Sequence, residues 1–162
     1  MTPWPYSRTS PADKSPSRAR SPGPSCDTVS HSIWLLRFDH GKPAPLDIEA
    51  FRAVTRPYVA TRESDHGFLG LRMPDRGEAE VYAALEPDGT LGSVLLTHFS
   101  AGAFLGLVAD LAIVLGAAIV LQDGVALIAN TEQHNHLVSE LRHAAVIIEL
   151  DGAAIQNVID RL

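Results

Sequence analysis

The sequence predicts an α+β fold in which helices pack on one face of a mainly antiparallel sheet. Turn-forming residues at 74–77, 86–89 and 123–124 each separate two apolar runs of strand length, which is typical of hairpins. Residues 104–115 instead place apolar side chains at helical intervals, as in a helix with one buried face. Hairpins interrupted by helices indicate an α+β protein rather than a parallel α/β sheet.

The first predicted elements are a strand, a turn and a helix. Residues 32–38 form an aliphatic and aromatic run, and residues 39–43 have turn chemistry. Asp47 is placed to cap a helix in which apolar residues recur three and four positions apart, until Pro57 shortens it. Residues 61–66 are polar and are expected to form an irregular connector.

Three strands and a long helix are expected next. Residues 67–73, 78–84 and 91–99 have strand character and are joined by the first two turns. Ser100 is a suitable N-cap for a helix over residues 101–115, because its hydroxyl can accept a hydrogen bond from the first turn.

The remaining elements begin where Gly116 ends that helix. Asp123-Gly124 predicts a two-residue turn, with positive φ at both residues, between strands 117–122 and 125–129. The chain is then expected to form a helix, a strand and a helix, at 131–142, 145–150 and 153–162. The order β-α-β-β-β-α-β-β-α-β-α resembles a ferredoxin-like arrangement with extra strands.

Residues 101–121 are the longest apolar segment of the chain and contain one charge, Asp110. Their length suits a membrane-spanning helix, and Gly102 and Gly106 form the GxxxG pattern of membrane helix dimers. A soluble structure without membrane contact is preferred, because the helical spacing stops at Gly116 and strand chemistry follows. Asp110 lies off the apolar stripe and is expected to face solvent. A membrane-associated protein that spans at 101–121 is the alternative.

Residues 1–28 contain six of the eleven prolines and six serines, a composition that predicts a disordered tail. A second explanation is a mis-assigned start, with the true start near Val29. Residues 29–162 are then expected to form one α+β domain. Because Cys26 is the single cysteine, no intrachain disulfide and no cysteine-based zinc site are expected, which fits a cytoplasmic protein.

Acidic residues dominate a long part of the core. Residues 77–141 carry eight acidic side chains and no Lys or Arg. Such a segment repels a phosphate backbone, so no nucleic-acid partner is expected, whereas it would attract a protein with a basic surface. The candidate partner-binding residues are the first four of these acidic side chains: Glu78, Glu80, Glu86 and Asp88.

No catalytic motif stands out, and the sequence assigns no cofactor, no metal site and no catalytic residue. An alternative hypothesis, a small hydrolase or metal-dependent enzyme, uses side chains that would converge in one pocket: Glu78, Glu80, His66 and His98. Glu78 and Glu80 would share one strand face, about 6–7 Å apart. His134 and His136 are two residues apart, so they diverge on a helix and are not expected to bind one metal ion.

Three segments resemble small actinobacterial proteins of the polymorphic-toxin immunity type. They are residues 34–41 with Leu46-Asp47, residues 77–82, and residues 107–115 followed by 118–121. The tail departs from this pattern. The resemblance implies a non-enzymatic protein that binds a toxin domain and blocks its active site. We therefore expect a protein-binding module, an immunity-type inhibitor of a basic toxin domain.

Overall fold

The structure is a computed structural model that describes residues 31–63 and 67–162. The predicted tail at residues 1–28 and the candidate residue His66 lie outside the described residues. The strands are β1 (Ile33–Asp39), β2 (Lys42–Ala44), β3 (Val59–Glu63), β4 (Phe68–Arg72), β5 (Glu78–Leu85), β6 (Leu91–Thr97), β7 (Ala118–Leu121), β8 (Ala126–Ile128) and β9 (Ala145–Ile147). The helices are α1 (Ile48–Thr55), the short 3-10 helix η1 (Arg56–Tyr58), α2 (Ala103–Leu115), α3 (Thr131–His136), α4 (Ser139–Arg142) and α5 (Gly152–Ile159).

The described strands form one sheet in the order β3-β4-β5-β6-β1-β7-β8-β9, and β2 pairs with β1 outside this path. All pairings are antiparallel except that of β8 with β9, which confirms the predicted α+β class. Within the sheet, β1-α1-β5-β6-α2-β7 follows the β-α-β-β-α-β order expected from the sequence. The β3–β4 hairpin extends this unit at one edge, and β8 and β9 extend it at the other.

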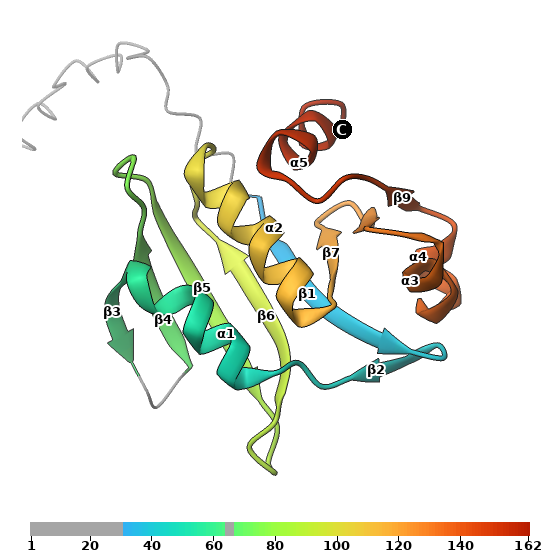
Figure 1. The fold of residues 1–162 in the computed structure, drawn as a ribbon, viewed down its shortest axis with the longest axis horizontal. Coiled ribbons are helices and arrows are strands. Elements are labelled where there is room, and N and C mark those ends of the chain that lie inside the picture. The colour runs from blue at the N-terminus through green and yellow to red at the C-terminus, as the bar shows by residue number, and fades with distance from the viewer. Residues whose placement is uncertain (1–30, 64–66) are drawn as a thin grey trace, which may run out of the picture.

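The two faces of the sheet carry separate apolar clusters, because successive side chains of a strand point to opposite faces. On one face, α1, α2 and α5 cover a large core that contains Leu35, Val94 and Phe104 (Figure 1). On the other face, Leu137 and Leu141 from the α3–α4 segment pack against β1, β7 and β8. The prediction of helices on one face therefore holds for α1, α2 and α5, whereas α3 and α4 pack on the opposite face.

The long apolar segment turns back on itself, as the sequence predicted. The helix α2 ends at Leu115, and Gly116 adopts a left-handed conformation with φ of 61°, a common way to end a helix. The following strand β7 is buried at all four residues. A single helix over 101–121 is therefore wrong, and no helix in the described residues is long and apolar enough to span a bilayer. Asp110 is exposed, as predicted.

One of the two GxxxG glycines, Gly106, lies at a contact within the chain. Gly152, the first residue of α5, lies so close to α2 that a Cβ atom on it would stand 2.8 Å from the backbone nitrogen of Gly106. A Cβ atom on Gly106 would meet no neighbouring atom within 4 Å outside its own helix backbone. The absence of a side chain at Gly152 therefore allows α5 to pack against α2.

Three hairpin loops place a left-handed residue at the same position: Arg76 in β4–β5, Gly89 in β5–β6 and Gly124 in β7–β8. In the last loop, the Gly124 N–H donates to the Leu121 carbonyl at 2.9 Å, and the Leu121 N–H donates to the Val125 carbonyl at 2.8 Å. This is a three-residue loop with a bulge. The two-residue turn predicted at 123–124 is wrong, because only Gly124 of that pair has positive φ.

Long-range contacts also change three local predictions. The turn predicted at 39–43 leads into β2, which pairs with β1. Much of the connector predicted at 61–66 belongs to β3, an edge strand paired with β4. The helix predicted at 131–142 is broken into α3 and α4, because Leu137 and Val138 are extended where Leu137 enters the second apolar cluster.

The N-terminus of α2 is capped from a distant loop. Gly102 precedes the helix and offers no capping side chain, so the N-cap predicted at Ser100 is wrong. Instead, the Asp75 carboxylate in the β4–β5 loop accepts hydrogen bonds from the N–H groups of Ala103 and Gly77, both at 3.0 Å. These hydrogen bonds lower the pKa of Asp75, and the one from Ala103 has the larger effect.

Candidate functional site

A row of apolar side chains crosses the sheet on the face that α3 and α4 partly cover. Register partners in neighbouring strands point to the same face. From β4 through β5 and β6 to β1, each member of the row is the register partner of the next: Phe68, Tyr82, Leu95 and Trp34. We call these four residues the apolar row.

The helices of the described residues leave most of the apolar row uncovered. Beyond Trp34 the same line of register partners continues to Val120 on β7. Val120 is buried together with Leu137, in the apolar cluster on the α3–α4 face of the sheet. In the other direction, the side chains of Leu95, Tyr82 and Phe68 belong to neither cluster of the described residues, and Tyr82 is 39% exposed. Phe68, Leu95 and Trp34 are half-buried. A line of partly exposed large apolar side chains is typical of a surface that binds another molecule.

Two carboxylates lie beside the row near the start of β5. Glu80 accepts a hydrogen bond from the Tyr82 hydroxyl at 3.2 Å, and its Oε2 atom lies 2.9 Å from Nδ1 of His98. Glu78 forms an ion pair with Arg72 at 3.1 Å. Glu78, Glu80 and His98 line one hollow of about 320 Å³. The structure thus brings together three of the residues that the enzyme hypothesis named.

Glu86 and Asp88, the other two predicted partner-binding residues, lie past the far end of the exposed part of β5. Asp88 accepts hydrogen bonds from the hydroxyl of Thr90 at 2.7 Å and from its N–H at 2.9 Å, and these bonds lower the pKa of Asp88. Asp88 therefore stabilises its own turn. The four predicted acidic residues lie in two pairs, with Tyr82 between them along β5.

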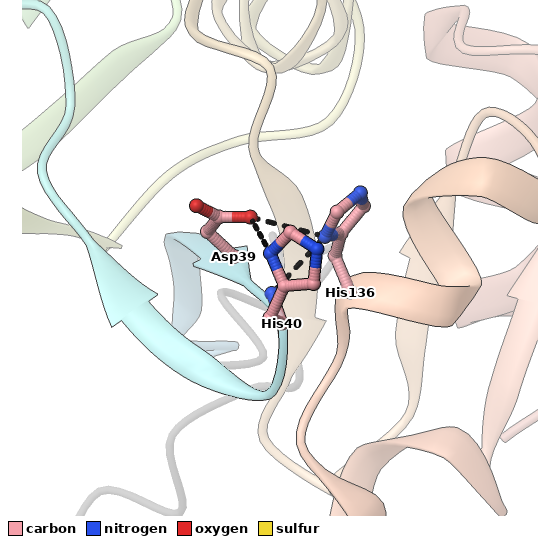
Figure 2. A group of neighbouring side chains, drawn as sticks. All are labelled: Asp39, His40 and His136. Carbon is pink, nitrogen blue, oxygen red and sulfur yellow. Dashed lines mark hydrogen bonds and ion pairs between the residues drawn. The ribbon is translucent and has the colours of Figure 1, made fainter.

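A second group of polar side chains joins two distant segments (Figure 2). Asp39 and His40, at and after the end of β1, meet His136 at the end of α3. The Oδ1 atom of Asp39 lies 2.6 Å from Nδ1 of His40 and 3.2 Å from Nδ1 of His136. The backbone N–H of His40 donates to Nδ1 of His136 at 3.0 Å. We call Asp39, His40 and His136 the Asp-His-His group.

Sequence reasoning missed the Asp-His-His group because its members are far apart along the chain. His40 and His136 are separated by 96 positions, and an Asp-His pair after a strand is ordinary turn chemistry. His134 is not in the group, since its Nε2 atom lies 3.4 Å from the carbonyl of Arg142. Only tertiary structure gives His136 its partners.

No protein-family model, no curated protein and no solved structure matches the chain. A function is therefore inferred from two features of the described residues: the apolar row with its carboxylates, and the Asp-His-His group.

Proposed function

We propose that this chain is a non-enzymatic protein-binding module, in which the apolar row and its neighbouring carboxylates hold a partner with a basic surface. The observation that carries this proposal is the exposure of Tyr82 among half-buried row neighbours on otherwise well-packed strands. Val81 and Val94, on the opposite face of the same two strands, are completely buried. The strands are thus held rigidly by one face while the other remains accessible.

The residue types in the row suit a protein interface. Trp34 and Tyr82 have rigid aromatic rings with a polar atom, and such residues contribute much of the binding energy at interfaces. Burial of apolar surface by a partner is favourable by roughly 25 cal/mol per Å². The Tyr82 ring is already oriented by its contact with Phe68, with ring centroids 5.2 Å apart. Binding would therefore cost little side-chain entropy at Tyr82.

The neighbouring charges define the chemistry of the partner. Glu78 and Glu80 lie at one end of the exposed part of β5, and Glu86 and Asp88 follow at the other. Lys or Arg side chains of a partner would make charge-assisted hydrogen bonds to these carboxylates. Together with the resemblance to immunity-type proteins, this favours a basic toxin domain, bound in the cytoplasm, as the partner.

The experiment places a photo-crosslinking amino acid at position 82, with position 123 in the β7–β8 loop as the control site. The full chain is cross-linked in lysate of cells that naturally express it, and the captured protein is identified, produced and titrated. We expect a partner with a basic surface captured at position 82 and not at 123. Tyr82→Ser should weaken its binding by at least about tenfold.

Val146→Ser is the matched control, because Val146 is an exposed apolar residue on β9, away from the row. Its effect on the dissociation constant should be less than about twofold. Glu80→Gln should reduce the salt dependence of binding, since it removes one charge from the interface. Equal binding by the wild type and Tyr82→Ser would contradict the proposal.

A small hydrolase or metal-dependent enzyme is the second candidate, because Glu78, Glu80 and His98 line the same hollow. A carboxylate in contact with an imidazole can transfer protons. His98 also has a left-handed backbone, with φ of 49°, which is strain of a kind found at functional sites. Hydrolysis of p-nitrophenyl acetate by the wild type, abolished by Glu80→Gln and by His98→Asn, would support this candidate.

A further inference from the structure

We propose that the Asp-His-His group is a binding site for a divalent first-row transition-metal ion of the Zn²⁺ type. The site is separate from the apolar row and goes beyond the protein-binding function. The observation that carries it is the convergence of two imidazole nitrogens on one carboxylate oxygen, Oδ1 of Asp39, from segments 96 positions apart.

Without a cation, the Asp39 carboxylate faces a nitrogen of His136 that has no hydrogen to donate to it. Its Nδ1 atom accepts the His40 N–H, so it carries a lone pair and cannot also donate to Asp39. The Asp39 carboxylate nevertheless lies 3.2 Å from that nitrogen. A positive ion bound by the carboxylate and the imidazole would make this approach favourable. Because Nδ1 has a single lone pair, His136 would give up its hydrogen bond from the His40 backbone N–H on binding the ion.

The spacing of the ligand atoms is close to that of a metal site. Zn²⁺ binds imidazole nitrogen and carboxylate oxygen at about 2.0–2.2 Å, so two ligands of one ion lie about 3 Å apart or slightly more. The ligand atoms of the three residues all lie within 4.8 Å of one another. The His40 side chain is 83% exposed, so its ring has room to move away from the 2.6 Å contact with Asp39.

The backbone holds the two segments together without an ion. His40 has a left-handed conformation with φ of 50°, which turns its N–H toward His136. The next residue, Gly41, donates its N–H to the His136 carbonyl at 3.0 Å. The Gly41 bond does not involve the imidazole ring, so it would still join the β1–β2 turn to the end of α3 when the ligand side chains adjust to bind an ion.

The donor set favours one class of ion and leaves a position open. Two imidazoles and a carboxylate suit Zn²⁺, Co²⁺ or Ni²⁺, whereas Ca²⁺ and Mg²⁺ prefer oxygen ligands. Three protein ligands leave a fourth position for water or a small ligand. Asp39 and His136 also line a hollow of about 520 Å³, with Asn130 and Glu132 in its wall, where such a ligand has room.

The test is a titration of the untagged, metal-stripped full chain with CoCl₂, followed by visible spectroscopy. We expect one equivalent of Co²⁺ to give the d–d bands of a four- or five-coordinate ion, and ZnCl₂ to displace it. His40→Asn should weaken Co²⁺ binding by at least about tenfold, as should His136→Gln, because each removes an imidazole ligand. Asparagine tolerates the left-handed backbone at position 40, so this variant should fold normally.

His134→Gln is the matched control, since it removes a neighbouring histidine outside the group. It should leave the Co²⁺ spectrum and affinity unchanged. Zn²⁺ should raise the Tm of the wild type and of His134→Gln but not that of His40→Asn. The proposal is overturned if the wild type shows no d–d bands, or if the His40→Asn/His136→Gln double variant binds Co²⁺ as tightly as the wild type. Those results would leave the Asp-His-His group as a hydrogen-bonded clamp only.

Discussion

The Asp75 carboxylate accepts a hydrogen bond from the backbone N–H of Ala103, 28 positions away, at the start of α2. The first N–H groups of a helix have no partner within the helix and attract negative charge. Asp75 supplies both the acceptor and the charge from the β4–β5 loop. The helix that covers the centre of the sheet is thereby linked to the β4–β5 hairpin.

Replacement of Asp75 by Ala should therefore destabilise the protein. The variant loses the hydrogen bonds to Ala103 and to Gly77, and we expect Tm to fall by about 4 °C. The measurement is thermal unfolding by circular dichroism. Asp123→Ala, at the corresponding position of the β7–β8 loop, is the control and should lower Tm by clearly less. Equal effects would show that the link to α2 contributes nothing.

The contribution of Asp75 should depend on pH in one direction. Its folded-state pKa is lowered below the ordinary value of 3.8, first by the hydrogen bond from Ala103. A group with a lowered pKa contributes stability fully above its unfolded-state pKa and loses it as pH falls through the folded-state pKa. The Tm difference between the wild type and Asp75→Asn should be constant near neutral pH and shrink below pH 3.8. A difference that grows with acidification would contradict this assignment.

Arg76→Gly should stabilise the protein. Arg76 is exposed and has a left-handed backbone with φ of 68°, a conformation unfavourable for residues with a Cβ atom. After allowance for the greater freedom of glycine in the unfolded chain, we expect a gain of about 0.5–1 kcal/mol in urea unfolding. Arg76→Ala removes the same charge and retains the strain, so it should give no gain.

The two glycines at the contact between α2 and α5 should respond oppositely to alanine. Gly152→Ala places a Cβ atom 2.8 Å from the nitrogen of Gly106, and we expect a loss of about 1–3 kcal/mol. Gly106→Ala meets no neighbouring atom within 4 Å and should gain about 0.5–1 kcal/mol as a better helix former. Urea unfolding of both variants provides the measurement. Destabilisation by both substitutions would show that α5 approaches α2 differently.

Substitutions at two neighbouring residues of β5, Val81 and Tyr82, should differ in their effect on stability. Val81 is completely buried, so Val81→Ala should cost about 2 kcal/mol of unfolding free energy. Tyr82→Ser, on the exposed face, should cost about 1 kcal/mol or less. Urea titrations of the two variants give both values. A loss at Tyr82 as large as that at Val81 would indicate that the apolar row is part of the folded core.

The sequence predicted most reliably the elements whose signal is local. The apolar spacing of α2, its end at Gly116 and the alternation of β5 are set by a few neighbouring residues, and the structure confirms them. The edge strand β3 ends in three polar residues, and β2 has three residues including Pro43, so neither has an apolar strand pattern of its own. Both form because an adjacent strand offers hydrogen-bonding partners.

The candidate sites likewise contain features that follow from local sequence and features that depend on long-range contacts. The shared face of Glu78 and Glu80 follows from strand alternation. The apolar row, in contrast, requires the register between four strands. Nothing around Trp34 in the sequence indicates that Leu95 will lie beside it, with Tyr82 on the strand beyond. Asp39 and His136 lie far apart along the chain and are brought together only by the tertiary structure, so no local pattern could have joined them.

The place of β1 between β6 and β7 also has a consequence for biosynthesis. Among the described strands β1 emerges first from the ribosome. Its short partner β2 follows at once, but its two main neighbours, β6 and β7, end at Thr97 and Leu121. Until Leu121 has been translated, the backbone of this largely apolar strand lacks at least one of these two hydrogen-bonding partners. Such delayed pairing slows folding and exposes the nascent strand to aggregation. The growing polypeptide should therefore be a client of ribosome-associated chaperones for much of its synthesis.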